Sequence, residues 1–499
     1  MLFRSVVPAP ANAAPGGGRQ GGAPAGPPTP ANQLPAQPNA AEIAHATWRE
    51  AGADLLDKIG PAIIVTHSAG GSFGLLVAEA RPNLVKAAVM VEGGGSGFLG
   101  GNRWGMSTIP VTWDPPVADP KEIKTRWVAD AEIDVGGYYL QEEPARKLPN
   151  LRNVAVLTVT SHAGQAAPGN PGAPAFLKQA GVRIAEEYRL VNAGIRGNSH
   201  MMMVEKNNRE VLQPILTWLD KNVNTGSAPA IKKRGTESTA IRLADTNYFW
   251  VGHEIQKKDY GTIVAGQMFV QYFIPEVVRQ PVPIVLVHGG GGQGTHYMGL
   301  DGNAGWAHYY IQNGYKVYLV DRPGHGRSPV SIEALGGPLG NLPMHAGIAA
   351  DTVRAAKGTP KRWPGTTGDI GDPLLDQFVA GQNAAPTNNE LMQTYWKLGG
   401  AQLLEKIGPA IVQTHSAGGP FGWLVANERP NLVKALVSFE GGGAPLIGQN
   451  GAAGTRLNLR GVPMMYLTAE NSGRANGPAI VQALNDSGAT AEHIALKDR

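Results

Sequence analysis

The chain has 499 residues, enough for two or three ordinary domains, and it contains no cysteine, which excludes disulfides, thiolate metal sites and a cysteine nucleophile. Its 43 basic and 39 acidic residues leave a formal net charge of +4. Because there is no long basic block, we do not expect nucleic acid as a partner. No apolar run approaches the ~20 residues that a membrane-spanning helix needs, so no membrane span is expected.

The amino-terminal residues differ in composition from the rest of the chain. Residues 8–38 consist almost wholly of Ala, Pro, Gly, Asn and Gln, which cannot bury enough apolar surface to offset the entropy of ordering. We predict a disordered lead-in over residues 1–40. The first residues include Arg4 but almost no hydrophobic region, so they are not a convincing signal peptide. The sequence therefore leaves two locations open, either cytoplasmic or periplasmic/secreted.

Residues 41–222 form a first unit in which helical and strand patterns alternate. In chain order we expect a helix at 41–58, strands at 61–65, 87–91 and 154–159, a helix near 173–181, a short strand near 188–191 and a helix at 208–223. Residues 93–150 are long, aromatic and rich in Gly and Pro, and stand where a lid insertion is expected.

A linker at 223–240 leads to a second unit, residues 241–499. Its expected elements are strand-like runs at 262–274 and 282–287, a strand at 316–320, a turn-rich excursion at 329–390, a helix, strands at 409–412 and 462–467 and a helix near 477–487. Long apolar strands that alternate with helices predict an α/β fold with a mostly parallel central sheet flanked by helices.

One stretch of about 40 residues occurs twice without a gap, at 55–95 and at 403–443. The serines and glutamates of the two copies share one offset, since 416 − 68 = 348 and 440 − 92 = 348. A second counterpart of His200 would lie beyond the last residue, and nothing before residue 55 resembles the HGGGGQG or DRPGHGRS segments of the second unit. We therefore expect two incomplete repeat units, each holding what the other is missing.

Each repeat places a serine at a junction between a strand and a helix. An apolar run leads directly into Thr-His-Ser-Ala-Gly-Gly, and a helix-compatible segment follows. A serine at such a turn adopts strained backbone geometry that exposes its hydroxyl at the carboxyl end of the strand. Ser68 and Ser416 are therefore candidate nucleophiles. Thr66 and Thr414 replace the first glycine of G-x-S-x-G, so the turn must make room, and an ordinary glycine-rich turn is the alternative.

A serine hydroxyl needs a base within hydrogen-bond reach and a third group that orients that base. Ser68, Glu92 and His200 follow one another in the order serine, acid, histidine, with His200 in a Gly-Asn-Ser-His loop. Glu92 and Glu440 each end the next strand and precede three glycines, while Glu470, one strand later, is the alternative acid. A surface histidine and helix-capping glutamates would be the non-catalytic interpretation.

Acyl transfer also needs donors aimed at the developing oxyanion, and backbone amides can supply them. One donor would come from Ala69 or Ala417, directly after the serine. Another would come from Gly289 or Gly290, because consecutive glycines allow the backbone to approach a substrate closely. A phosphate-binding loop is disfavoured, since the glycines do not match either nucleotide-binding pattern.

The remaining histidines do not suggest a metal. His288, His296, His308 and His325 lack the spacing of metal ligands, so we predict neither a metal nor a cofactor. His67 and His415 adjoin the serines in sequence, but their side chains should point away from those of the serines. We expect these two histidines only to support the turn.

Four motifs together carry a resemblance: HGGGGQG after one strand, DRPGHGRS after the next, THSAGG at the turn and GNSHMMM late in the first unit, with WPGT at 363–366. The chain resembles bacterial serine esterases of the α/β-hydrolase superfamily over roughly residues 40–222 and 240–499. The resemblance implies an α/β-hydrolase fold and hydrolysis of a small-molecule carboxylic ester through a Ser-Glu-His triad, an acyl-enzyme and an oxyanion hole. It assigns the nucleophile, acid and base roles to Ser68, Glu92 and His200.

Two incomplete units leave three arrangements open. Residues 182–222 could provide the last strand and His200 to Ser416 and Glu440. Residues 41–222 could instead use opening strands from 240–400 and keep Ser68. In the third, two chains complete each other as a strand-swapped homo-oligomer. Pairing of adjacent strands favours the first arrangement, because it closes shorter loops, whereas proximity within the triad favours the second.

Two other functional interpretations remain. The chain could be a catalytically incomplete tandem fusion that binds a ligand or partner, or the same fold could perform epoxide hydrolysis, lyase or perhydrolase chemistry. Serine at both turns argues against an aspartate nucleophile of the epoxide hydrolase and dehalogenase type. Four aromatic residues of the lid would suit an apolar or aromatic substrate group, or simply pack the lid onto the body: Trp104, Trp113, Tyr138 and Tyr139.

Overall fold

The computed structural model divides the chain into two compact units, residues 1–230 and 231–499, and the division falls inside the expected linker. The residues that the structure describes are 39–93, 97–98, 101–129, 137–164, 171–223, 241–300, 303–340, 371–442, 457–469 and 477–496. The expected lead-in up to residue 38, the linker from 224 to 240, the WPGT segment and Glu470 lie outside them.

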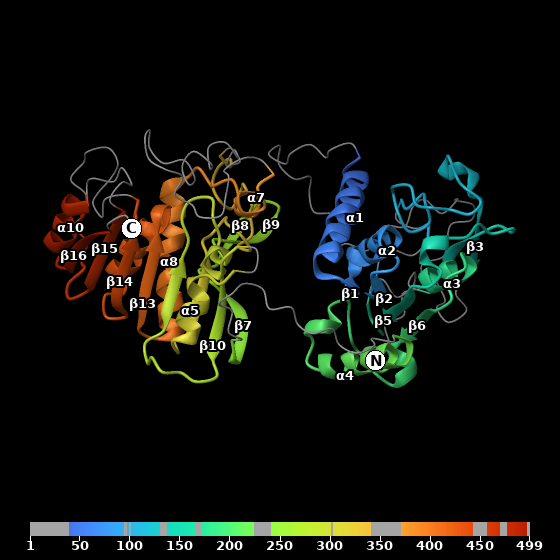
Figure 1. Ribbon diagram of the computed structural model, residues 1–499, viewed down its shortest axis with the longest axis horizontal. Coiled ribbons are helices and arrows are strands. Elements are labelled where there is room, and N and C mark those ends of the chain that lie inside the picture. The colour runs from blue at the N-terminus through green and yellow to red at the C-terminus, as the bar shows by residue number, and fades with distance from the viewer. Residues whose placement is uncertain are drawn as a thin grey trace. The chain divides into compact units, whose positions relative to one another are not determined.

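Unit 1 is built on a parallel sheet with the strand order β1-β2-β5-β6 (Figure 1). The sheet strands are β1 (Ala62–His67), β2 (Val85–Val91), β5 (Ala155–Thr160) and β6 (Ala185–Arg189). The helices are α1 (Ala40–Ile59), α2 (Gly71–Ala80), α3 (Gly172–Gln179) and α4 (Asn208–Asn222). An antiparallel hairpin of β3 (Thr125–Ala129) and β4 (Gly137–Gln141) belongs to the excursion between β2 and β5.

The two faces of this sheet bury separate apolar cores. Along β2, Ala88 and Met90 belong to the core that includes residues of α1, α2 and α3. The alternate residues Val89 and Val91 belong to the core that includes α4. This division follows from the strand geometry, in which successive side chains point to opposite faces.

The expected lid contributes to the first of these cores. Trp104 is 7% exposed and Trp113 is 4% exposed, and both belong to the cluster that contains Phe176 of α3. The ring centroids of Trp113 and Phe176 lie 6.2 Å apart. Of the two interpretations of these tryptophans, the structure supports packing of the excursion onto the body of unit 1. Tyr138 and Tyr139 are only partly buried.

Unit 2 contains a sheet of eight strands in the order β16-β15-β14-β13-β11-β12-β10-β7. Neighbouring strands are parallel except at β10, which is antiparallel to β7 and β12. The sheet strands are β7 (Leu243–Val251), β10 (Met268–Pro275), β11 (Ile284–Val287), β12 (Val317–Asp321), β13 (Ala410–His415), β14 (Val433–Phe439), β15 (Pro463–Ala469) and β16 (Thr490–Leu496). The helices are α5 (Trp306–Gln312), α7 (Pro373–Ala380), α8 (Asn389–Ile407), α9 (Gly419–Glu428) and α10 (Gly477–Asp486), and β8 (Glu254–Lys258) pairs with β9 (Gly261–Ala265).

The prediction that residues 241–499 lack a final strand is wrong, because β16 pairs with β15 in the sheet of unit 2. Its sequence, TAEHIAL, has few large apolar residues, and the strand lies at the sheet edge with most of its residues exposed. An edge strand of this kind carries a weak sequence signal because it buries little. Residues 182–222 do not complete the sheet of unit 2, because β6 pairs with β5. Strands from 240–400 do not complete the sheet of unit 1 either, because neither large sheet contains a strand of the other unit. Both predicted arrangements within one chain are therefore wrong. Strand swapping between chains stays a prediction.

The repeated segments therefore have different neighbours. β13 is central in its sheet and pairs with β11, whereas its counterpart β1 is an edge strand. A Cβ atom added at Gly418 would lie 2.5 Å from the carbonyl oxygen of His288, just after β11. For a Cβ atom added at the matching Gly70, the nearest heavy atom is Cβ of Thr66, at 3.6 Å. One glycine of the repeated motif is thus required by close packing in unit 2 alone.

We predict that Gly418→Ala destabilises unit 2 by about 1–3 kcal/mol, the usual cost of overpacking against a fixed backbone. The matched substitution Gly70→Ala should change the stability of unit 1 by less than about 1 kcal/mol, because both glycines have helical backbone angles and only Gly418 is crowded. Urea unfolding followed by proteolysis, with peptides from each unit quantified by mass spectrometry, measures both values. Equal effects of the two substitutions would contradict the packing argument.

Candidate active site

Both repeated serines lie at a turn from a strand into a helix. Ser68 follows β1 and begins a single 3-10 turn before α2, and Ser416 does the same between β13 and α9. Their φ angles are +54° and +48°, in the left-handed region that residues other than glycine seldom adopt. This is the strained strand-turn-helix geometry that the sequence motif predicted.

The threonine that replaces the first glycine of the motif is accommodated by a glycine on the following helix. A Cβ atom added at Gly74 would lie 3.2 Å from Cγ2 of Thr66, and one at Gly422 would lie 3.0 Å from Cγ2 of Thr414. The Thr66 hydroxyl donates a hydrogen bond to the carbonyl oxygen of Val89 at 3.3 Å. The helix glycine occurs at the same place in both repeats, at Gly74 and Gly422, so its position in the sequence could have predicted the room for this threonine.

Three candidates of unit 1 form a continuous hydrogen-bonded chain. Nε2 of His200 lies 2.8 Å from Oγ of Ser68, and Nδ1 of His200 lies 3.3 Å from Oε2 of Glu92. A carboxylate oxygen can only accept, so Nδ1 carries the imidazole proton and Nε2 accepts the hydroxyl proton of Ser68. The Glu92 side chain is fully buried, while that of His200 is 21% exposed.

Glu92 is fixed by its own backbone and by the strand beside it. Its φ angle is +47°, and its amide donates to the carbonyl oxygen of Val159 at 2.9 Å. The amide of Ser161 donates to Oε1 of Glu92 at 2.7 Å, which leaves Oε2 for His200. A Cβ atom at Gly164 would lie 2.1 Å from Oε2, so this position has no room for a side chain. Neither Ser161 nor Gly164 was predicted from the sequence to contribute to the site.

The loop that carries His200 is held by a carboxylate in the next turn. The amide of Ser199 donates to Oε1 of Glu205 at 2.9 Å, and the amide group of Asn198 donates to Oε2 at 2.6 Å. Hydrogen bonds from Ser199 lower the pKa of Glu205, which keeps this anchor ionised. Nε2 of His67 donates to the carbonyl oxygen of His200 at 2.8 Å. His67, expected only to support the turn, therefore also helps to hold the His200 loop.

In unit 2 the glycine-rich loop after β11 lies beside Ser416. A Cβ atom at Gly289 would be 3.2 Å from Cβ of Ser416, and one at Gly290 would be 3.4 Å from Cβ of Ala417. The two glycines and Ser416 line a cavity of about 760 Å³ together with His288 and His296. Within the described part of unit 1 the sheet begins with β1, so that part contains no counterpart of this loop.

Buried basic residues hold the glycine loop in place. Arg322 donates to the carbonyl oxygens of Gly289 at 2.7 Å and of Ala417 at 3.3 Å, and its guanidinium lies 4.7 Å from the ring centroid of Trp396. Burial lowers the pKa of Arg322 to about 9. His288 donates through Nδ1 to the carbonyl oxygen of Gly289 at 2.8 Å and accepts at Nε2 from the Arg322 amide at 3.1 Å. Burial lowers the pKa of His288, in keeping with this neutral tautomer.

The acid candidate of unit 2 is placed as in unit 1, but the described residues of this unit place no candidate base beside Ser416. Glu440 has a φ angle of +50°, and its carboxylate accepts a hydrogen bond from the amide of Ala469. Among the residues that the structure describes, no histidine hydrogen-bonds the hydroxyl of Ser416. His493 instead lies with Nε2 2.9 Å from the hydroxyl of Thr468. The candidate base therefore lies beside Ser68, and the glycine loop lies beside Ser416.

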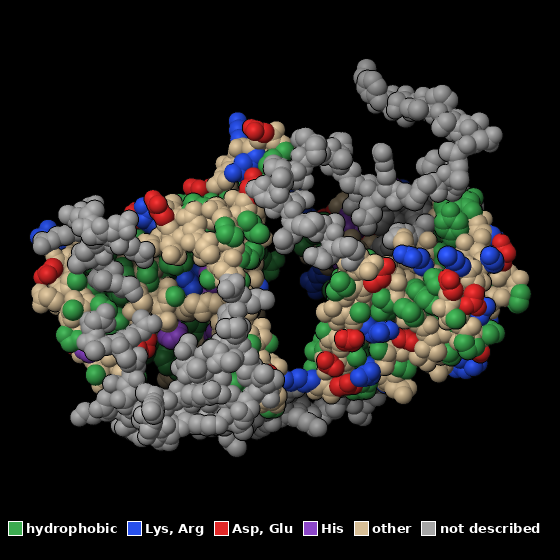
Figure 2. Space-filling view, turned by 90° about the horizontal axis from the view of Figure 1, so that it is seen from above, with side chains coloured by type: hydrophobic (Ala, Val, Ile, Leu, Met, Phe, Trp, Pro, Cys, Tyr) green, Lys and Arg blue, Asp and Glu red, His purple; other side chains and the backbone are tan. Residues whose placement is uncertain are grey.

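The described residues contain no group of three or more His, Asp or Glu side chains that could hold a metal ion. None of the described helices is long and apolar enough to cross a membrane. On the face shown in Figure 2, Lys and Arg side chains are interspersed with Asp and Glu.

Comparisons with known proteins place these features in context. A family model described as the alpha/beta hydrolase fold matches residues 282–450. A protein named "Probable secreted lipase phiG", from a fungal species (strain ATCC 74256), is 32% identical over 205 residues, which are 40% of this chain and 54% of that protein. The chain thus spans about half the length of this relative.

Two solved structures are similar at low identity. A novel bacterial esterase has 20% identity and a TM-score of 0.42, and the match covers 53% of this chain and 89% of that one. The naproxen esterase of Bacillus subtilis has 12% identity and a TM-score of 0.29, with 59% and 92% covered. The match to the family model, together with the mostly parallel eight-stranded sheet and the serine turn after β13, identifies the fold as the α/β-hydrolase fold.

Proposed function

We propose that unit 1 hydrolyses carboxylic esters with Ser68 as the nucleophile, His200 as the general base and Glu92 as the group that orients His200. The observation that carries this proposal is the hydrogen-bonded chain from the Ser68 hydroxyl through both ring nitrogens of His200 to the buried Glu92 carboxylate. A serine becomes a useful nucleophile at neutral pH only with such a base. The similarity to a probable secreted lipase supports an ester as the substrate.

The first half of the reaction forms an acyl-enzyme. Oγ of Ser68 attacks the carbonyl carbon of the ester while its proton moves to Nε2 of His200. Glu92 stabilises the resulting imidazolium through Nδ1. The tetrahedral intermediate then breaks its bond to the alcohol oxygen, and the proton on Nε2 passes to that leaving oxygen. The alcohol departs, and the acyl group stays on Ser68.

The second half uses water as the nucleophile. His200 accepts a proton from the water molecule, whose oxygen attacks the acyl carbon, and then returns that proton to Oγ of Ser68 as the carboxylic acid leaves. The amide of Ala69, directly after the nucleophile, is the proposed oxyanion donor of unit 1. Backbone donors of this kind typically contribute about 10²–10³-fold to the rate.

A second candidate function comes from the separation of parts between the units. Ser416 has the glycine loop and the cavity of about 760 Å³, but it lacks a described base. Unit 2 would then bind a ligand without hydrolysing it, and the chain would be a catalytically incomplete tandem protein if Ser68 were also inactive. The two functions differ in whether Ser68 is activated.

We expect a fluorophosphonate probe, which reacts with base-activated serines, to label Ser68 and to leave Ser416 unlabelled. The two peptides differ in sequence, AIIVTHSAGG against AIVQTHSAGG, so peptide mapping by mass spectrometry separates them. Ser68→Ala should lower p-nitrophenyl ester hydrolysis by at least about 10⁴-fold, and Ser416→Ala should leave it unchanged. Labelling of neither serine would favour the incomplete tandem protein, and labelling of Ser416 alone would contradict the assignment to unit 1.

The two acids provide a second matched pair. Glu92→Gln should lower kcat by about 10³–10⁴-fold, because a neutral amide no longer fixes the imidazole tautomer or stabilises its cation. Glu440→Gln, at the equivalent position of unit 2, should leave kcat within about twofold of the parent, since it removes the same chemistry from a serine without a described base. Steady-state hydrolysis measures both rates. A larger loss of kcat with Glu440→Gln than with Glu92→Gln would contradict the assignment of the reaction to unit 1.

A further inference from the structure

Helix α5 carries two stripes of apolar side chains, and only one of them is buried. Ala307 is 0% exposed and Ile311 is 3% exposed, and both belong to the core cluster that contains Leu286 of β11. On the other stripe, Trp306 is 45% exposed and Tyr309 is 41% exposed. Aromatic side chains at helical spacing usually pack into a core, because they bury large apolar areas. The exposed aromatic stripe of α5 therefore offers a surface for binding.

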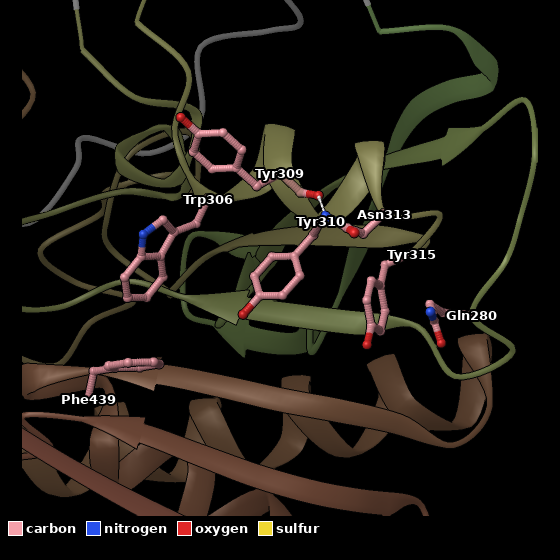
Figure 3. A pocket seen from close by; sticks show the side chains of 7 residues that line it. All are labelled: Gln280, Trp306, Tyr309, Tyr310, Asn313, Tyr315 and Phe439. Atoms are coloured by element: carbon pink, nitrogen blue, oxygen red, sulfur yellow. Dashed lines mark hydrogen bonds between the residues drawn. The ribbon is translucent and has the colours of Figure 1, made fainter. Parts of the chain in front are cut away.

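This stripe forms one wall of a groove of about 470 Å³ (Figure 3). Sites for small molecules typically have volumes of about 300–1,000 Å³. In Figure 3 the rings of Trp306, Tyr310 and Tyr315 follow one another along the groove. Phe439 of β14 approaches Trp306 from the strand below. The described side chains that line the groove are aromatic or carry a carboxamide: Gln280, Trp306, Tyr309, Tyr310, Asn313, Tyr315 and Phe439.

Contacts within the groove and beneath it hold the rings in place. The Tyr310 hydroxyl donates a hydrogen bond at 2.6 Å to Oε1 of Gln413, a buried residue of β13. The ring centroids of Tyr310 and Tyr315 are 5.6 Å apart. Those of Trp306 and Phe439 are 4.7 Å apart. Rings that are already fixed lose little conformational freedom when a ligand binds, so the groove is preorganised.

Two residues that support the groove differ between the repeated segments. Gln413 and Phe439 correspond to Val65 and Val91 through the shared offset of 348 residues. A valine could fill either position in an apolar core. It could neither accept a hydrogen bond from a tyrosine hydroxyl nor present an aromatic ring to a ligand. Both differences between the repeats therefore support the groove of unit 2.

The lining indicates the chemistry of the ligand. None of the described lining residues is charged, so the groove offers no ion pair to an acidic or basic ligand. Carboxamide and phenol groups both donate and accept hydrogen bonds, as the hydroxyl groups of a sugar do. Nδ2 of Asn313 donates to the carbonyl oxygen of Tyr309 at 2.8 Å, so Oδ1 is the atom that can accept from a ligand. The aromatic faces match the apolar C–H face of a pyranose ring.

An aromatic cage for a quaternary ammonium ion is another use of clustered rings. Such a cage surrounds the cation with ring faces. Here Trp306 contacts Phe439 directly, and Tyr310 contacts Tyr315 directly. Neither pair leaves space for a cation between its rings. A row of rings beside hydrogen-bonding side chains instead fits an elongated neutral ligand.

We propose that the groove along α5 binds a linear neutral oligosaccharide. Its pyranose rings stack on Trp306 and Tyr310. Its hydroxyl groups form hydrogen bonds with the carboxamides of Gln280 and Asn313. The proposal rests on the groove and does not depend on the esterase chemistry of unit 1. Because Trp306 also lines the cavity beside Ser416, the bound saccharide lies next to that cavity.

The test is isothermal titration calorimetry of the full chain with cellohexaose, xylohexaose, mannohexaose and maltohexaose. We expect saturable binding of at least one of them. Trp306→Ala should weaken this binding at least about tenfold, as the loss of an aromatic anchor does. Gln280→Met keeps the length of the side chain but removes its hydrogen-bonding groups, and should weaken binding roughly 2–10-fold. Tyr248→Ala removes an aromatic side chain that is 55% exposed elsewhere in unit 2, so this matched control should leave binding unchanged.

Four results would overturn the proposal. One is the absence of saturable binding with every oligosaccharide, and another is binding that neither substitution weakens. A third is binding that Trp306→Ala weakens and Gln280→Met does not, which would place the sugar in the cavity beside Ser416. The fourth is a dimer of the sugar-free chain that Trp306→Ala dissociates in sedimentation velocity, because a second copy would then occupy the groove. Circular dichroism identifies a variant that fails to fold, and the other variant then decides.

Discussion

The hydrogen bond between Ser68 and His200 joins two segments that lie 132 residues apart, and the proposed chemistry of unit 1 depends on it. Parallel strands make this contact feasible, because their carboxyl ends meet at one edge of the sheet, where ligands of open α/β sheets bind. Other contacts fix the side chains that take part. The left-handed turn positions Ser68, and a hydrogen bond from the amide of Ser161 positions the Glu92 carboxylate. His200 is held by the His67 ring and by the loop that Glu205 anchors.

The same sequence, repeated in one chain, takes different roles according to its neighbours. Around Ser416, β11 brings the glycine loop and Arg322 fixes it, whereas Ser68 lies at a sheet edge with the histidine loop beside it. Burial follows the same rule. Val89 is fully buried in the core that includes α4, whereas its counterpart Val437 in unit 2 is only partly buried. The neighbouring elements, and not the motif itself, therefore decide whether a serine lies beside the glycine loop or beside the histidine loop.

Much of the fold could be predicted because its strongest signals are local. Apolar runs indicated β2, β5, β11 and β15, and helical periodicity indicated α4 and α10 close to their observed bounds. Among the elements that were missed, β7, β8 and β16 have many exposed residues. Such strands are stabilised by backbone pairing with a neighbour, and a sequence window does not contain that neighbour. For the same reason the sequence analysis left three arrangements of strands open.

By itself the sequence determined the repeated serine turns, the order of serine, acid and histidine in unit 1, and the α/β class, since each depends on residue types at short spacing. Tertiary structure alone decided that His200 meets Ser68, that Gly289 lies beside Ser416, and that Gly164 leaves space for the Glu92 carboxylate. These contacts join residues distant in the chain, and their distances depend on strand order and register. The physical reason is that local preference selects a turn or a strand, whereas only packing selects its neighbours.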